Sequence, residues 1–467
     1  MTGETFEPST FFCDAVMESR TFLEHYVAYL TSWKGFSAVV FISILAFGVW
    51  KERRRRLLQE REQNEKSENV RGCLRLGIYG RSMLEDQYRA PLVGSNSNEK
   101  QRPTVKAIFV YPIKSCGGVE LQRAGVTSTG LVCDRIFSFA QLVPTDTGHE
   151  WRFVTQREFP KLSLLKTELW LPNLQELDED AEVDRVESWP ANGGCVVVRF
   201  PYIAGTGAGL KTEIASIKLP LNPTFERSTA KEYAEEHLTI WKDCPLATNM
   251  TNEIPTTTLA KLEHFLGARN PLGIFRQNDN QLRKISRSLP ADHSGEDFRV
   301  GFPDAFSVHI LNMASIRDVD ASMPEGSAAK GRLDARRFRA NIYVSGTPAY
   351  AEDSWKRIAI GNAANEDSIS QAPGVYHAAC RTARCNVPNV DPQTGIKASL
   401  FMYRAPALDH NEPGTTLRRT RQVDEGAKPH PCLGLSLIPL FDRGVFKLGD
   451  EVKILETGEH YYQKMFP

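Results

Sequence analysis

Hydrophobic residues of this chain fall mainly into short runs that end at proline, glycine or polar residues. Some runs alternate apolar with polar residues, which is typical of half-buried strands, and others are continuously apolar, as in fully buried strands. Residues 446–455 predict a hairpin near the C-terminal end of the chain. The other runs that we interpret as strands are 105–111, 135–140, 164–171, 195–200, 307–311 and 341–345.

Helical spacing of apolar residues is much rarer. Residues 255–267 predict a helix, because Leu259, Leu262 and Phe265 share one face, a proline stands at the start and a glycine at the end. A shorter helix is expected at 314–318. Many short strands with few helices predict a mainly β fold with some helices (α+β), built from β-barrel-like units.

One apolar run is longer than the others and predicts a membrane anchor. Residues 35–50 carry no charge and would span about 24 Å as a helix, which approaches the thickness of the hydrocarbon core. Basic residues follow at once and should stay in the cytosol, together with everything after them. A cleaved signal peptide fits less well, because acidic residues precede the run and no small-residue cleavage site follows. We therefore expect a tail (1–34), a transmembrane anchor (35–51) and a basic, polar tether (52–103).

The composition narrows the class of protein. A chain of 467 residues can hold two to three domains. Lys+Arg and Asp+Glu both number 57, so no overall charge points to a nucleic acid partner. Nine scattered cysteines favour free thiols in a reducing compartment over a disulfide framework. The polar stretch 405–431 is expected to be a surface insertion, and the charge run 176–184 a solvated loop.

Three segments combine residue types that suit the binding of a metal and a phosphate. Arg384 adjoins Cys385, and a neighbouring guanidinium favours the thiolate, the form in which cysteine binds metal. Lys114 and Ser115 follow a predicted strand and precede two glycines, so an ammonium, a hydroxyl and turn amides can together hold a phosphate. Arg339 enters a predicted strand, where its guanidinium can fork onto a phosphate.

These motifs, with the segments 351–355 and 448–450 in the same order, resemble the MOSC family over roughly residues 104–455. Within that family the chain looks most like the mitochondrial amidoxime-reducing components. The resemblance implies a β-rich MOSC N-terminal region (104–270) and a MOSC domain (271–467) with a β-barrel. It also implies a molybdenum–molybdopterin cofactor (Mo cofactor) between the two regions.

The resemblance assigns roles to individual residues. Cys385 would be the catalytic cysteine that binds molybdenum. Segment 104–140 would contribute to the C-terminal region, because Lys114 and Arg135 must reach the same phosphate as Arg339. From the residues alone, Cys385 could instead be a buried structural cysteine, and Arg135 could form a surface ion pair with Asp134. The residues that the resemblance places on the cofactor are Lys114, Ser115, Arg135, Ser307, Arg339, Asn341 and Arg384.

Asp304 matches an aspartate that the family places near the metal. Reductive N–O cleavage consumes protons, so a carboxyl group there could relay them and count as catalytic; an Asx-turn residue is the alternative. Ala305 and Phe306 stand where the family usually has two hydroxyls, and Ser307 is expected to compensate. His309, alone on an apolar strand, is interpreted as a core histidine with satisfied hydrogen bonds.

The implied function is a molybdenum-dependent reductase of small N-hydroxylated compounds such as amidoximes. The resemblance implies that it receives electrons from cytochrome b5 and NADH cytochrome b5 reductase. Its anchor would lie in the mitochondrial outer membrane, with the endoplasmic reticulum as the alternative. The competing function is a molybdenum-cofactor or sulfur carrier of the MOSC type. A complete sulfurase is not expected, since about a hundred residues precede the match, too few for its additional large domain.

Overall fold

A computed structural model describes residues 70–89, 102–173, 175, 184–205, 210–293, 295–364, 372–397 and 411–464. The predicted tail, the predicted anchor (35–51) and most of the tether lie outside these residues, as does nearly all of the charge run 176–184. Within the described ranges, no helix combines the length and the apolar character that crossing a bilayer requires. Residues from Arg71 onward form one compact unit.

A four-stranded antiparallel sheet with the order β1-β8-β9-β10 packs its apolar side into the core. Val196, Val198 and Phe200 of β9 point to the same side and belong to the main hydrophobic cluster. The strands are β1 Cys73–Leu76, β8 Lys166–Pro172, β9 Cys195–Ala204 and β10 Lys211–Pro220.

A small closed barrel follows the order β11-β12-β13-β6-β7 and closes through a parallel pairing of β11 with β7. Phe153, Leu238 and Phe275 are among the buried residues of its core. The strands are β6 Phe137–Thr145, β7 Gly148–Phe153, β11 Ala234–Thr239, β12 Leu246–Asn249 and β13 Leu272–Gln277.

The third sheet is the largest and has the order β3-β2-β17-β16-β20-β19-β18-β21-β4-β5, with β22 also paired to β18. Its strands are β2 Thr104–Val110, β3 Val119–Leu121, β4 Arg123–Thr127, β5 Gly130–Leu131, β16 Val308–Asn312, β17 Ile342–Ser345, β18 Trp355–Ala364, β19 Ala372–Ala383, β20 Cys432–Pro439, β21 Arg443–Lys447 and β22 Lys453–Thr457. Two short strands, β14 Arg283–Lys284 and β15 Arg299–Val300, form a separate pair.

Helices are few in the described part of the chain. The predicted helix at 255–267 is confirmed: it follows Pro255 and ends at Gly267, whose φ of 75° is the left-handed conformation that glycine adopts without strain. The helices are α3 Phe225–Ala230, α4 Thr256–Leu266, α5 Met313–Ser322 and α6 Gly414–Thr420, with 3-10 turns η1 Pro160–Leu164, η3 Thr251–Glu253, η4 Ala291–His293, η5 Ala335–Phe338, η6 Ala351–Ser354 and η7 Val387–Asn389.

The mainly β fold is confirmed, but two local predictions are wrong. The expected hairpin at 446–455 does not form, because β21 and β22 both pair with β18 and not with each other. The expected surface insertion is packed where it is described, at 411–431, with Glu412, Leu417 and Asp424 buried. Residues 398–410 lie outside the described residues.

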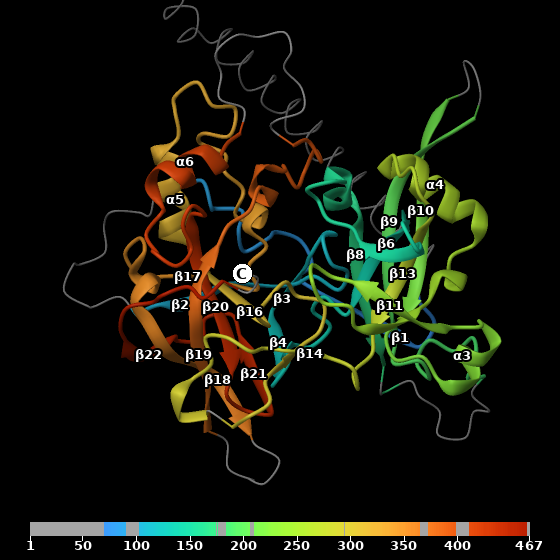
Figure 1. Cartoon of the computed structure of the whole chain (residues 1–467), viewed down its shortest axis with the longest axis horizontal. Helices are drawn as coiled ribbons and strands as arrows, with labels where there is room; N and C mark the ends of the chain where they lie inside the picture. The colour runs from blue at the N-terminus through green and yellow to red at the C-terminus, as the bar shows by residue number, and fades with distance from the viewer. Residues whose placement is uncertain are drawn as a thin grey trace, which may run out of the picture. The chain divides into compact units, whose positions relative to one another are not determined.

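Segments far apart in the sequence meet in the large sheet. The early strand β2 pairs with the late strand β17, so segment 104–140 contributes to the C-terminal sheet as predicted. Figure 1 shows the blue β2 beside the orange β17. The division expected at residue 270 does not follow the sheets, because β13 belongs to the barrel and β2–β5 to the large sheet.

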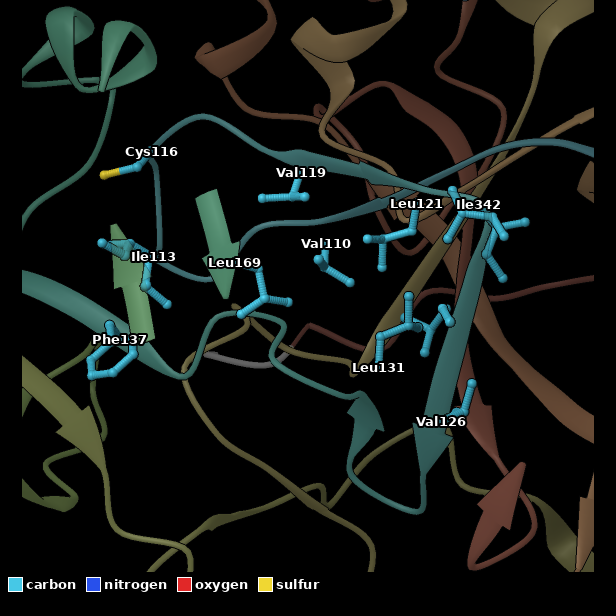
Figure 2. Packing of buried hydrophobic residues seen from close by; sticks show 14 of the residues in the cluster. Val110, Ile113, Cys116, Val119, Leu121, Val126, Leu131, Phe137, Leu169 and Ile342 are labelled. Carbon is cyan, nitrogen blue, oxygen red and sulfur yellow. The ribbon is translucent and has the colours of Figure 1, made fainter. Parts of the chain in front are cut away.

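One hydrophobic cluster connects all three sheets. It includes Val110 of β2, Leu169 of β8, Ile274 of β13 and Ile342 of β17. Figure 2 shows part of this packing, including Ile113, which precedes Lys114 in the sequence. The loops that join these sheets are therefore attached to one continuous core, which fixes the position of their polar side chains.

Candidate functional site

A cavity of about 230 Å³ is lined by loops that leave or enter strands of the large sheet and of the barrel. Lys114 follows β2, Arg135 precedes β6, and Cys385 lies just after β19. The sequence predicted nine site residues, and the structure brings eight of them together in this cavity. These eight are Lys114, Ser115, Arg135, Asp304, Arg339, Asn341, Arg384 and Cys385.

Ser307 is the exception. Its neighbours Phe306 and Val308 line the cavity, whereas Ser307 does not. The Ser307 side chain is buried, and its hydroxyl donates to the Leu437 carbonyl at 3.4 Å. Successive residues of an extended chain point to opposite sides, so Ser307 cannot supply the hydroxyl that Ala305 and Phe306 lack.

Lys114 and Asp304 form an ion pair at the cavity wall. The Lys114 ammonium is buried and donates to the Asp304 carboxylate at 2.5 Å and to the Phe302 carbonyl at 2.7 Å. Desolvation lowers the pKa of Lys114 to about 8, although the charge of Asp304 opposes that shift. Desolvation raises the pKa of Asp304, but the Lys114 ammonium outweighs it and holds that pKa below its usual range. Asp304 is thus ionised at neutral pH.

Arg135 connects two other elements of the site. Its guanidinium pairs with the Asp134 carboxylate, donates to the Arg339 carbonyl at 3.0 Å and to Asn341 Oδ1 at 3.4 Å. Asp134 in turn accepts a hydrogen bond from the Tyr111 backbone at 2.7 Å. The side chains of Arg135 and Asp134 are only 14% and 2% exposed, so this is not the surface ion pair that the sequence also allowed.

Arg339 lies deeper in the same wall. One terminal nitrogen donates to the Cys116 carbonyl at 2.6 Å, and the other is buried without a hydrogen-bond partner. The guanidinium carbon lies 4.2 Å from the centre of the Tyr111 ring, where a cation–π contact stabilises it. Desolvation lowers the pKa of Arg339, but an arginine stays charged throughout the neutral range.

Three of these residues have an unusual backbone conformation. Ser115, Arg135 and Arg339 have φ values of 68°, 51° and 53°, in the left-handed region that residues other than glycine rarely adopt. Such strain tends to occur at functional sites, where the surrounding structure fixes it. At Arg339 this conformation ends η5 and turns the chain toward β17.

Cys385 lies at the exposed end of the cavity, so the alternative of a buried structural cysteine is wrong. Its neighbour Arg384 donates from a terminal nitrogen to the Phe338 carbonyl at 2.7 Å, and the Arg384 Nε is buried without a partner. Cys380 also lines the cavity but is buried, and desolvation raises the pKa of its thiol well above the usual range. Cys385 is thus the accessible thiol of the pair.

Two basic lining residues were not assigned to the site from the sequence. His309 was interpreted as a satisfied core histidine, yet it lines the cavity and its buried Nε2 has no hydrogen-bond partner. Desolvation holds the pKa of His309 well below its ordinary value, so the ring is neutral. Arg157, which follows β7, also lines the cavity. Neither residue belongs to a recognisable motif, so only the position of His309 five residues after Asp304 offered a signal.

The cavity is lined by more cationic than anionic side chains. Lys114 and Arg135 have carboxylate partners, but Arg157, Arg339 and Arg384 have none among the described residues. Buried polar atoms are normally hydrogen-bonded, so the unpaired nitrogens of Arg339, Arg384 and His309 indicate a missing ligand. A phosphate-bearing ligand next to a thiol-bound metal would satisfy them.

Comparisons with known proteins agree with this geometry. The profile of the family described as "MOSC N-terminal beta barrel domain" matches residues 102–184, and that of the "MOSC domain" matches residues 297–453. The chain is a MOSC-domain protein. The MOSC-domain match contains Asp304, Arg339 and Cys385, and the N-terminal match contains Lys114 and Arg135.

Curated relatives of this MOSC-domain protein cover most of its length. "Mitochondrial amidoxime reducing component 2" of Bos taurus is 25% identical over 376 residues, 80% of this chain and 88% of the relative. "Mitochondrial amidoxime-reducing component 1" of Homo sapiens is 25% identical over 361 residues, 76% and 84% of the two chains. "Molybdenum cofactor sulfurase" of Arabidopsis thaliana is 25% identical over 324 residues, 68% of this chain but 31% of the relative.

Proposed function

We propose that this MOSC-domain protein binds a molybdenum–molybdopterin cofactor and reduces small N-hydroxylated compounds of the amidoxime type. The observation that carries the proposal is an exposed cysteine, Cys385, in a cavity that is also lined by cations, two of which, Arg339 and Arg384, have buried nitrogens without a partner. The names of the relatives from Bos taurus and Homo sapiens supply the substrate class.

The donor set fits the cofactor. Lys114, Arg135 and Arg339 would hold its phosphate, since ammonium and guanidinium groups make strong charge-assisted hydrogen bonds to phosphate oxygens. Ser115, Asn341 and Arg384 would contact the rest of the pterin. Cys385 would bind the metal as a thiolate, a ligand type that soft metal centres favour.

When bound, the cofactor supplies the electrons that reduce the N–O bond. The balanced reaction takes an amidoxime, two electrons and two protons to an amidine and water. We propose cytochrome b5 with NADH cytochrome b5 reductase as the electron source, and the outer mitochondrial membrane as the location, through the anchor predicted at 35–51. The relatives from Bos taurus and Homo sapiens are named as mitochondrial, which supports that organelle.

The chain's own residues arrange the substrate end of the site. Asp304 is ionised, so it accepts a hydrogen bond and orients the Lys114 ammonium but is poorly matched to donate a proton itself. The exposed position of Cys385 lets a small substrate approach from solvent, while buried Asn341 and His309 close the opposite end.

A reconstitution tests the proposal against the carrier alternative. Full-length protein loaded with the cofactor is mixed with cytochrome b5, its reductase and NADH, and amidine formation from benzamidoxime is measured. Turnover is the expected result. A protein that contains molybdenum and pterin but reduces no N-hydroxylated compound would instead be a carrier of the cofactor or of sulfur.

Retention of the cofactor is expected to weaken above pH 8. Lys114, with a pKa of about 8, is protonated below that pH and loses its proton above it. A phosphate binds the protonated form, so each further pH unit should weaken binding by up to about tenfold. Molybdenum and pterin remaining after dialysis at pH 7, 8 and 9 measure this. Lys114→Arg, which stays charged, should remove the pH dependence; the same decline in both proteins would assign the titration to another group.

Asp304→Asn should move that decline to lower pH. The Asp304 charge raises the pKa of Lys114, so removing the charge while keeping a hydrogen-bond acceptor lowers that pKa further. The same dialysis series, extended to pH 6, measures the shift. If Asp304 acts only as a proton relay, turnover will slow while the pH at which the cofactor is lost stays where it is in the wild type.

A further inference from the structure

Arg157 is a cation of the cavity that the preceding assignments do not use. Its Nε donates to Thr155 Oγ1 at 3.3 Å, and its carbonyl accepts from Lys397 Nζ at 3.1 Å. Within the described ranges, no carboxylate pairs with it, and its two terminal nitrogens donate to no protein group. Its guanidinium is therefore available to a ligand.

Among the described residues, the guanidinium of Arg157 is held by stacking on an indole ring, and not by an ion pair with an acid. The guanidinium carbon lies 4.2 Å from the centre of the Trp241 ring. Trp241 is itself fixed, because its N–H donates to the Asp304 carboxylate at 3.2 Å and its ring meets the edge of Phe153. Stacking orients an arginine without neutralising it, so its fork of donors stays free for an anion.

Exposure distinguishes the two ends of the cavity. Lys114 and Asn341 are buried, whereas Cys385 is exposed and Asp304 retains 64% of its side-chain surface. Trp241, which touches both Asp304 and Arg157, is 37% exposed. Through its contact with Trp241, Arg157 is linked to the exposed part of the cavity wall, whereas Lys114, Arg135 and Arg339 already provide three cations for the phosphate.

We propose that Arg157, positioned by Trp241, binds an anionic group of the substrate, so that N-hydroxylated compounds with a carboxylate remote from the N–O bond are preferred. This inference rests on the proposed reductase function. It names the chemistry of the favoured substrate: a planar or compact N-hydroxylated group at one end and a carboxylate at the other.

A matched pair of substrates tests this. Benzamidoxime and 4-carboxybenzamidoxime differ only in the carboxylate, and the ratio of their kcat/KM values is measured with the loaded full-length protein. The wild type should favour the carboxylate compound, and Arg157→Gln should reduce the ratio by about tenfold, the effect of one charge-assisted hydrogen bond at a half-exposed site. Arg152→Gln, on neighbouring β7 but outside the cavity and paired with Glu150, is the control and should leave the ratio unchanged.

Trp241 acts by positioning Arg157, so its role is tested by the separate KM values of the two substrates. Trp241→Leu should raise KM for the carboxylate compound more than KM for benzamidoxime, and Trp241→Phe, which restores an aromatic face, should recover most of the loss. Equal changes in KM for both substrates would show a merely structural role and contradict the positioning by Trp241.

Binding without turnover separates this proposal from the reductase function. Calorimetric titration compares the amidines 4-carboxybenzamidine and benzamidine on wild type and Arg157→Gln. Selective binding of the carboxylate that depends on Arg157 supports the inference even if no amidoxime is reduced. The inference is overturned if the wild type does not discriminate between the two amidines. It is also overturned if Arg157→Gln loses molybdenum and pterin, because Arg157 would then hold the cofactor.

Discussion

Replacing Cys385 with alanine is expected to abolish amidoxime reduction while substantial pterin stays bound. Cys385 provides the exposed thiol of the cavity, and a thiolate ligand binds the metal directly. The pterin would be held separately by Lys114, Arg135 and Arg339, and none of these contacts involves Cys385. Turnover of benzamidoxime, molybdenum by mass spectrometry and pterin by fluorescence measure the three parts of this expectation.

Two other cysteines provide controls for that variant. Cys244 is exposed and does not line the cavity, so Cys244→Ala should behave as wild type. Cys380 lines the cavity, but desolvation raises its pKa and keeps its thiol protonated, so Cys380→Ala should retain activity and molybdenum. Wild-type turnover by Cys385→Ala would contradict the assignment of Cys385 as the metal ligand.

Arg339→Gln should weaken the retention of pterin and molybdenum together, whereas Cys385→Ala should keep the pterin. The buried, unpaired nitrogen of Arg339 is aimed at no protein group, and a charge-assisted hydrogen bond contributes about 1.5–3 kcal/mol. Retention should therefore fall by about tenfold to a hundredfold. Glutamine is preferable to glycine here, because it does not relieve the left-handed backbone at this position. Pterin and molybdenum per protein after dialysis are the measurements.

The matched control for Arg339 lies in η5, the 3-10 turn that Arg339 ends. Arg336 is paired with Asp334 and does not line the cavity, so Arg336→Gln should keep the cofactor. Thermal unfolding of both variants without cofactor checks that neither loses its fold. If Arg339→Gln retained pterin as well as Arg336→Gln does, the phosphate would have to bind elsewhere.

Some strands were predictable from the sequence, whereas others, such as β10, β18 and β19, were not, and neither were the strand partners. The apolar runs at 105–111 and 195–200 predicted β2 and β9, because a buried strand leaves a local pattern in the sequence. The hairpin at 446–455 failed because pairing depends on the whole sheet: β18 is long enough for β21 and β22 to pair with different parts of it. A local pattern identifies a strand but does not predict which strand it pairs with.

Polar composition misled the interpretation of 411–431. Charged residues usually lie at the surface, but here Arg421 pairs with Asp353, and Glu412 accepts a hydrogen bond from the Thr416 hydroxyl at 2.9 Å. Burial of such groups depends on partners that only the fold supplies. The same reason explains the site: Lys114 and Cys385 belong to recognisable motifs, whereas Arg157 and His309 acquire their positions from strands and loops elsewhere in the chain.

The pairing of early with late segments of the chain also determines when the cavity can form during synthesis of the protein. The Arg135 bond to the Arg339 carbonyl joins residues 204 positions apart, and the Lys114 bond to the Phe302 carbonyl joins residues 188 apart. Strand β20, which ends at Pro439, lies between β16 and β19. Contacts across such long loops form late in folding. A chain still on the ribosome therefore cannot complete the cationic cavity until nearly all of it has been synthesised, so the proposed cofactor would enter after translation.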